Sequence, residues 1–189
     1  MPQHYDYVYR VADMAELKGR RYDGKRNHIK RMRRHHPVYT YGPLEREDRD
    51  AALALFEAWC AARPAIRGGE GRPEDLEYEC QRKSLWRAFE AYEALGLVGG
   101  ALRIDGALAG FVIASELTPE MACVHLEYHR PDVPGLAQTL LWESCRSTFA
   151  EFTYVNLEQD LGIEGLRRHK SSYHPVRMEE KFEVVCRGS

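Results

Sequence analysis

Closely spaced cysteines and long apolar runs are both missing from this sequence. Its five cysteines lie far apart, from Cys60 to Cys186, and form no C-x-x-C pair, which argues against a disulfide framework and against a zinc site. No apolar stretch approaches the roughly 20 residues that span a bilayer, and no signal peptide opens the chain. We therefore expect reduced thiols in a cytoplasmic protein without a transmembrane segment.

The composition is that of an ordinary folded domain. The chain has 189 residues, 44% of them hydrophobic and 30% charged, which suffices for one sizeable core and excludes a disordered chain. Periodicity predicts strands at 5–10, 100–104, 108–115, 121–128, 152–159 and 178–186, a turn at 40–44, and helices at 18–34, 47–62, 74–95 and 136–149. Asp105-Gly106 joins two of these strands as a hairpin. The fold predicted is one α/β (α+β) domain, a mixed central sheet flanked by helices.

The residues from 152 to 182 contain the densest set of candidate site residues. A strand pattern places Asn156 and Glu158 on one side, and Asp160 follows in the same register where a helix N-cap is expected. On that helix Lys170 falls on the apolar face. Because ligands gather at the carboxyl ends of strands in α/β sheets, we predict a polar site there. The alternative is that Asp160 only caps the helix and Lys170 extends its ammonium into water.

The segment 18–34 is the most basic part of the chain, with Asp23 as its only acid. Helical spacing leaves Ile29 and Met32 as a thin apolar stripe surrounded by lysines and arginines. Clustered cations of this kind suit tRNA, phosphate or anionic lipid headgroups, because they release counterions from a polyanion. The alternative is a solvated helix that docks through its apolar stripe.

Two histidines and an acid share one side of the strand predicted at 121–128 and its end: His125, Glu127 and His129. A pair of histidines can hold a metal, but the sequence offers no obvious third ligand. We therefore predict no metal site.

The order of these elements resembles the fold of the Gcn5-related N-acetyltransferases. In that fold the acyl donor lies beside the strand that precedes the third helix, and a Q/R-x-x-G-x-G/A loop holds its pyrophosphate through backbone N–H groups. The corresponding loop runs from Asp132 to Ala137, and the resemblance implies that Gly135, Leu136 and Ala137 bind the donor. Asp132 and Pro134 depart from the pattern, since a carboxylate repels a diphosphate and proline has no N–H.

Two longer motifs carry a closer resemblance. YDYVYRVADMAELKGRRYDGKRNHIKR at 5–31 and VNLEQDLGIEGLRRHKSSYHPVRMEEKF at 155–182 are similar to a bacterial family grouped with the C-terminal domain of phosphatidylglycerol lysyltransferases. That grouping is related to the Fem-type aminoacyl-tRNA-dependent transferases, and its members carry two tandem acyltransferase-like halves. The resemblance implies that residues 1–37 are the remnant of a preceding half and that residues 38–189 form the acyltransferase-like domain.

The resemblance implies transfer of an acyl or aminoacyl group from aminoacyl-tRNA or acyl-CoA to an amine or hydroxyl on a small molecule, peptide or lipid headgroup. The donor would be a substrate, so no tightly bound cofactor is expected, and a homodimer could replace the missing half. The positions predicted to contact a polyanion such as tRNA are Lys25, Arg26, Asn27 and Lys30. The alternative is a non-catalytic tRNA- or nucleotide-binding or regulatory module on the same fold.

Aminolysis of an ester requires a deprotonated nucleophile and a stabilised oxyanion. Lys170 would supply positive charge for the oxyanion or for the donor's terminal phosphate. Glu158 or Asp160 would take the acceptor's proton. Asn156 would orient the donor or acceptor, and Tyr173 would contact the donor.

Overall fold

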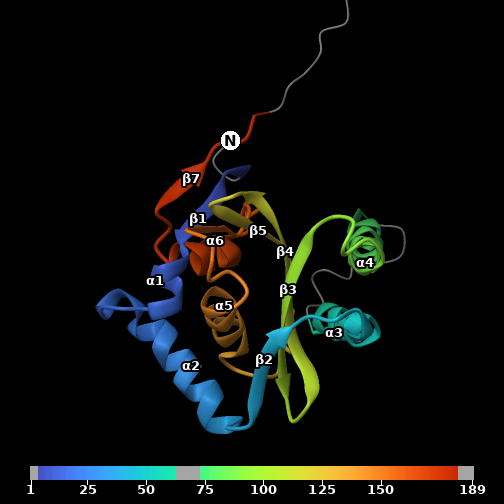
Figure 1. Cartoon of the computed structure of the whole chain (residues 1–189), viewed down its shortest axis with the longest axis horizontal. Coiled ribbons are helices and arrows are strands. Elements are labelled where there is room, and N and C mark those ends of the chain that lie inside the picture. The colour runs from blue at the N-terminus through green and yellow to red at the C-terminus, as the bar shows by residue number, and fades with distance from the viewer. Residues whose placement is uncertain (1–3, 63–72, 183–189) are drawn as a thin grey trace, which may run out of the picture.

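Seven strands of the described chain form one mixed sheet in the order β2-β3-β4-β5-β6-β1-β7 (Figure 1). The computed structural model describes residues 4–62 and 73–182. The strands are β1 (Asp6–Arg10), β2 (Tyr39–Pro43), β3 (Leu97–Ile104), β4 (Ala107–Thr118), β5 (Met121–His129), β6 (Tyr154–Asn156) and β7 (Arg177–Glu179). Neighbouring strands are antiparallel except β5 and β6, which are parallel.

Helices cover both faces of this sheet. One side carries α1 (Val11–Glu16), α2 (Asp23–His35) and α5 (Leu136–Arg146), and the other carries α3 (Arg49–Ala61) and α4 (Pro73–Glu90) (Figure 1). α6 (Glu164–Ser171) follows β6, and two short 3-10 turns, η2 (Arg20–Tyr22) and η3 (Arg46–Asp48), precede α2 and α3. A separate apolar cluster is buried on each face. The predicted α/β (α+β) class, a mixed sheet flanked by helices, is confirmed. None of the described helices has the length and apolar character needed to cross a bilayer.

The hairpin between β3 and β4 forms where it was predicted. Asp105 and Gly106 both have positive φ, 52° and 81°, as a two-residue type I′ turn requires. β2 was not predicted, because the sequence at 40–44 indicates a turn. The segment is extended because it pairs with β3 and because Tyr39 and Tyr41 donate hydrogen bonds to Glu143 (2.7 Å) and Ser144 (2.9 Å) of α5.

The N-terminal strand lies inside the sheet. β1 pairs with β6 on one side and with β7 on the other. Its tyrosines are buried, and the Tyr9 hydroxyl donates to the backbone carbonyl of Lys170 (2.9 Å). Residues 1–37, predicted to be the remnant of a preceding half, thus contribute an interior strand to the same sheet as residues 38–189.

Candidate functional site

The parallel strands β5 and β6 stay together over three residues only. Tyr154–Asn156 pairs with Met121–Cys123, after which β5 continues to His129 while the chain turns away from it. The strand predicted at 152–159 therefore ends at Asn156. Three of the four predicted catalytic groups, Asn156, Glu158 and Asp160, lie at or just beyond this end of β6.

Lys170 reaches this turn from α6 and is 8% exposed. Its ammonium donates to three backbone carbonyls, those of Leu157, Glu158 (3.1 Å) and Gln159 (2.7 Å). An ammonium has three hydrogens, so all of them are used inside the protein. Burial lowers the pKa of Lys170, and the nearby carboxylates oppose that effect. The ammonium therefore holds the turn in place, and donation to an oxyanion, as predicted, would require breaking one of these bonds.

The Asn156 side chain fixes the same turn from the strand side. Its amide nitrogen donates to Asp6 Oδ2 (3.0 Å), and its oxygen accepts from the backbone N–H of Glu158 (2.7 Å). Glu158 has a φ of 57°, a left-handed conformation that costs a residue with a side chain about 1–2 kcal/mol. Asn156 and Lys170 together stabilise this conformation and so position the Glu158 carboxylate. Asn156 was predicted to orient a substrate, and its amide is instead bonded within the protein.

Asp160 is buried in an ion pair. It accepts hydrogen bonds from Arg167 Nε (2.8 Å), from the Tyr7 hydroxyl (2.6 Å) and from the backbone N–H of Gly162 (2.8 Å). The hydrogen bond from Arg167 holds the pKa of Asp160 well below its usual range, and burial only partly opposes this. Asp160 was expected to cap the helix, but Ile163 occupies the N-cap position of α6. A carboxylate that is so weakly basic is also unsuited to take a proton from an amine.

The stability of this ion pair should depend on pH with a definite sign. Because the pKa of Asp160 in the folded chain is below its ordinary value of 3.8, its stabilising contribution is complete above that value and is lost as the pH falls toward the folded pKa. We expect Asp160→Asn to lower the free energy of unfolding at pH 7 by about 2–4 kcal/mol and by less at pH 3, as measured by urea denaturation.

The matched control for this prediction is Asp132→Asn, which breaks an exposed pair with Arg130. This substitution should change the free energy of unfolding by no more than about 0.5 kcal/mol at either pH. A loss for Asp160→Asn that is the same at pH 3 and pH 7 would contradict the assigned ion pair.

A β-bulge in β5 positions His125, the residue that hydrogen-bonds to Glu158. Ile113 of β4 pairs with Leu126, but the next residue, Ala114, pairs with Val124, so His125 is the extra residue of β5. A bulge breaks the alternation of faces: Ala122 and Val124 belong to the core under α5, whereas Leu126 and Tyr128 pack toward the core under α3. The predicted common face of His125, Glu127 and His129 is therefore wrong.

His125 joins three polar side chains at this bulge. Its Nδ1 lies 3.2 Å from Glu158 Oε1, its Nε2 lies 2.8 Å from Ser115 Oγ, and Cys123 Sγ lies 3.9 Å from the same Glu158 oxygen. Hydrogen bonds with Cys123 and Glu158 raise the pKa of His125 to about 10. Sequence reasoning named Glu158 but missed its neighbour Cys123 and also Ser115, which bonds to His125. A bulge has no signature in hydrophobic periodicity.

The partly buried Glu127 and the buried Tyr173 lie close enough to interact electrostatically. Burial raises the pKa of Glu127 to about 7, and the positive charge of Lys170 opposes this shift. The Tyr173 hydroxyl is buried and has no hydrogen-bond partner among the residues that the structure describes. Burial and the charge of Glu127 raise the pKa of Tyr173. Tyr173 was predicted to contact the donor, and the structure places it beneath the surface.

The predicted donor loop lies against α2. Gly135 has a φ of 88°, and a Cβ added there would lie 2.2 Å from the His28 carbonyl oxygen. Leu136 is fully buried, and Ala137 is half-buried. The Cβ side of Gly135 thus packs against α2, and the Leu136 N–H donates to the Val133 carbonyl (3.2 Å) rather than pointing to a free site. Donor binding at Gly135, Leu136 and Ala137 stays a prediction.

The four residues predicted to contact a polyanion do not share one surface. Lys25 donates to Ser172 Oγ (2.6 Å) and lies 3.7 Å from the centre of the Tyr173 ring, and burial lowers its pKa to about 8. Arg26 bonds to Asp23 and to the carbonyl oxygens of Leu17 and Gly19. Asn27 and Lys30 are exposed.

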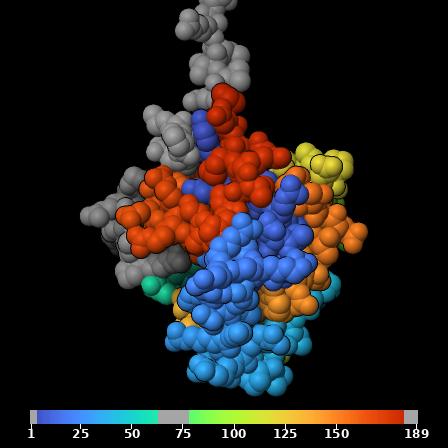
Figure 2. Space-filling view, turned by 90° about the vertical axis from the view of Figure 1, so that its left-hand side faces the viewer, coloured from blue at the N-terminus to red at the C-terminus, as the bar shows by residue number. Residues whose placement is uncertain are grey.

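The exposed positive charge of α2 lies further along the helix. Lys30, Arg31, Arg33 and Arg34 are all exposed, and no ion pair involves any of them within the described ranges. Figure 2 shows this helix, in lighter blue, running across the surface below the C-terminal segment in red. A basic surface therefore exists, but it is centred one to two turns beyond Lys25.

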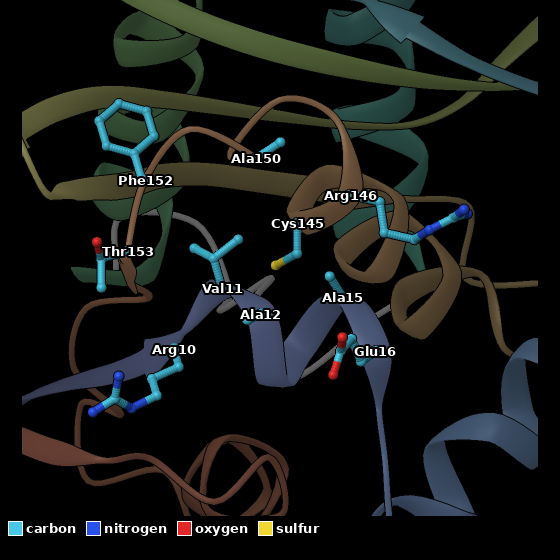
Figure 3. A pocket seen from close by; sticks show the side chains of 10 residues that line it. All are labelled: Arg10, Val11, Ala12, Ala15, Glu16, Cys145, Arg146, Ala150, Phe152 and Thr153. Atoms are coloured by element: carbon cyan, nitrogen blue, oxygen red, sulfur yellow. The ribbon is translucent and has the colours of Figure 1, made fainter.

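A separate cavity of about 410 Å³ lies between α1, the end of α5 and the segment that leads into β6 (Figure 3). Its lining is mostly apolar, and Cys145, Val11 and Phe152 are part of it. None of the predicted site residues lines this cavity, so it does not belong to the site at β5 and β6.

The sheet order, the parting parallel strands and the crossover helix define an acyltransferase-type α/β fold. A ribosomal-protein-alanine N-acetyltransferase from Brucella melitensis biovar Abortus 2308 has this fold, with a TM-score of 0.52 and 18% identity over 80% of this chain and 100% of that one. The chain belongs to the family described as phosphatidylglycerol lysyltransferase, C-terminal, whose model matches residues 2–185. This confirms the resemblance that the two motifs carry.

Two solved structures are similar over most of this chain. A conserved protein of unknown function from Bacteroides thetaiotaomicron VPI-5482 is 34% identical, with a TM-score of 0.83 over 94% of this chain and 58% of that one. The C-terminal domain of a putative lysylphosphatidylglycerol synthetase from Agrobacterium fabrum is 19% identical, with a TM-score of 0.62 over 94% and 58%. The chain thus spans little more than half the length of these relatives. No protein of curated function matches it.

Proposed function

We propose that this chain transfers an acyl or aminoacyl group from an activated donor to an amine or hydroxyl acceptor. The observation that carries the proposal is the position of the Glu158 carboxylate. Glu158 lies in a turn that Asn156 and Lys170 stabilise, at the point where β5 and β6 stop pairing. Membership of the lysyltransferase C-terminal family supports the type of reaction. In the reaction the acceptor nitrogen or oxygen bonds to the donor's carbonyl carbon, and the donor's alcohol or thiol leaves with a proton.

Each predicted catalytic residue receives a role that its contacts allow. Glu158 Oε2 accepts no hydrogen bond from the described residues, so it is free to orient an N–H or O–H of the acceptor. Asn156 and Lys170 are positioning residues, since they hold the Glu158 backbone. Asp160 anchors α6 through Tyr7 and Arg167.

The donor we propose is aminoacyl-tRNA rather than acyl-CoA. In the acetyltransferase fold a diphosphate binds the backbone N–H groups of the donor loop, but here the Leu136 N–H donates to the Val133 carbonyl (3.2 Å). Pro134 has no N–H and Asp132 is anionic, which also disfavours acyl-CoA. The exposed cations of α2 instead offer a surface to a long polyanion. This face of α2 carries four exposed cations and no acid, which favours RNA phosphates. The four cations are Lys30, Arg31, Arg33 and Arg34.

A transfer assay with two donors tests the proposal. Labelled aminoacyl-tRNA or acyl-CoA is incubated with the chain and with amine, peptide and lipid acceptors, and the label is followed into product. We expect product from the tRNA donor only, and we expect Glu158→Gln to lower kcat/KM by about 10- to 100-fold, because acceptor orientation is lost.

Glu164→Gln is the matched control, because Glu164 is exposed and, within the part of the chain that the structure describes, pairs only with Arg168. It should keep the rate of the unmodified chain. Full activity in Glu158→Gln would refute the assigned role. Salt-dependent tRNA binding without any turnover would instead support the non-catalytic binding module.

A further inference from the structure

Three side chains with metal-ligand chemistry meet beside the bulge of β5. One ligand atom each from Cys123, His125 and Glu158 lies within 4.8 Å of the other two. The His125 Nδ1 to Glu158 Oε1 distance is 3.2 Å, and the Cys123 Sγ to Glu158 Oε1 distance is 3.9 Å. Ligands held at about 2.0–2.3 Å from a tetrahedral zinc ion are roughly 3.3–3.8 Å apart. The group therefore needs little rearrangement to bind a metal.

The third ligand is held in place before any metal arrives. Glu158 follows the end of β6 in a left-handed conformation that Asn156 and Lys170 stabilise through its N–H and C=O groups. Cys123 and His125 belong to β5, whose pairing with β4 fixes the bulge. Rigid placement by neighbouring strands lowers the entropic cost of assembling a ligand set.

The surroundings of His125 match those of a metal-bound imidazole. Its second nitrogen, Nε2, hydrogen-bonds to Ser115 Oγ at 2.8 Å, and such an outer partner fixes the ring and leaves Nδ1 for the ion. Cys123 is only 6% exposed, whereas the side chains of His125 and Glu158 are each 40% exposed. The site is therefore closed on the thiol side and open to solvent on the other, as expected of three protein ligands plus one exchangeable position.

We propose that Cys123, His125 and Glu158 bind one divalent transition-metal ion of the zinc class. A thiolate with an imidazole suits zinc or cobalt, while magnesium and calcium prefer oxygen ligands alone. The sequence offered only His129 as a second ligand beside His125, and so no metal site was predicted. The structure instead brings His125 together with Cys123 and Glu158. This site goes beyond the transferase proposal and does not depend on it.

Metal titration of the whole chain tests the site. After dialysis against chelator, zinc is added in a calorimeter, and cobalt is added while the visible absorption of thiolate-bound cobalt is recorded. We expect one metal per chain, no measurable magnesium binding, at least about 100-fold weaker zinc binding in His125→Gln, and about 10-fold weaker binding in Ser115→Ala.

Matched controls separate ligand loss from unfolding. His35→Gln and Cys80→Ser change exposed residues of the same types away from the site and should bind zinc like the unmodified chain. His125 is partly exposed, so His125→Gln should fold even if the buried Cys123→Ser does not, and circular dichroism checks both. No zinc binding, or equal affinity in His125→Gln, would overturn the proposal. Because the readout is metal binding, a failure of the transfer assay would not affect it.

Discussion

Lys170→Ala is expected to lower the free energy of unfolding by about 3–5 kcal/mol. The substitution leaves the carbonyls of Leu157, Glu158 and Gln159 without their shared donor, and an unsatisfied buried polar group costs about 1–3 kcal/mol. Urea denaturation with the same slope for both proteins would measure the difference. The loss would show that this lysine acts first on the structure of the turn and only through it on Glu158.

Two further variants make this prediction specific. Lys170→Met keeps most of the apolar stem but removes the ammonium, so it should lose nearly as much stability as Lys170→Ala. Lys30→Ala, on the exposed side of α2, should change stability by no more than about 0.5 kcal/mol. If Lys170→Ala left the midpoint of urea unfolding unchanged and abolished transfer, the predicted catalytic role of the ammonium would be supported instead.

Gly135→Ala is expected to lower the free energy of unfolding by about 2–4 kcal/mol. Its φ of 88° is strained for any residue with a Cβ, and the added carbon would lie 2.2 Å from the His28 carbonyl oxygen and 3.2 Å from the Met32 Cβ. The left-handed backbone accounts for about 1–2 kcal/mol, and forcing α2 away from α5 adds a similar amount. Thermal and urea unfolding of the same variant would measure the total.

Helical glycines elsewhere in the chain serve as controls. A Cβ at Gly24 in α2 or at Gly165 in α6 meets nothing within 4 Å. Alanine at either position should therefore stabilise the chain by about 0.5–1 kcal/mol. A Gly135→Ala variant as stable as these two would show that α2 does not press on the loop, and the donor loop would again be a candidate for binding a diphosphate.

Local chemistry predicted one turn of the fold and the inward orientation of one residue of the candidate site. Asp105-Gly106 predicted its hairpin because few residues other than glycine and asparagine accept positive φ in succession. Helical spacing placed Lys170 on the inward side of α6, and its ammonium does meet the Glu158 backbone. In both cases the determining interaction spans only a few residues or one helical face.

Long-range contacts decided the parts that local patterns could not predict. β2 is a strand because tyrosines 39 and 41 reach α5, although its own sequence favours a turn. The loop at Gly135 lies beneath α2, which is about a hundred residues earlier in the chain. The local sequence of neither segment indicates which distant helix it contacts.

By itself the sequence determined the fold class, the family and the inward orientation of Lys170, since side-chain periodicity and motif spacing are local properties of the chain. Only the tertiary structure decided which polar groups meet. His125 is an extra residue of β5 between two residues that pair with consecutive residues of β4. Such a bulge is set by the pairing of the two strands and not by the sequence of one of them. It brings His125 to Ser115 and Glu158, where strand alternation alone had paired it with His129.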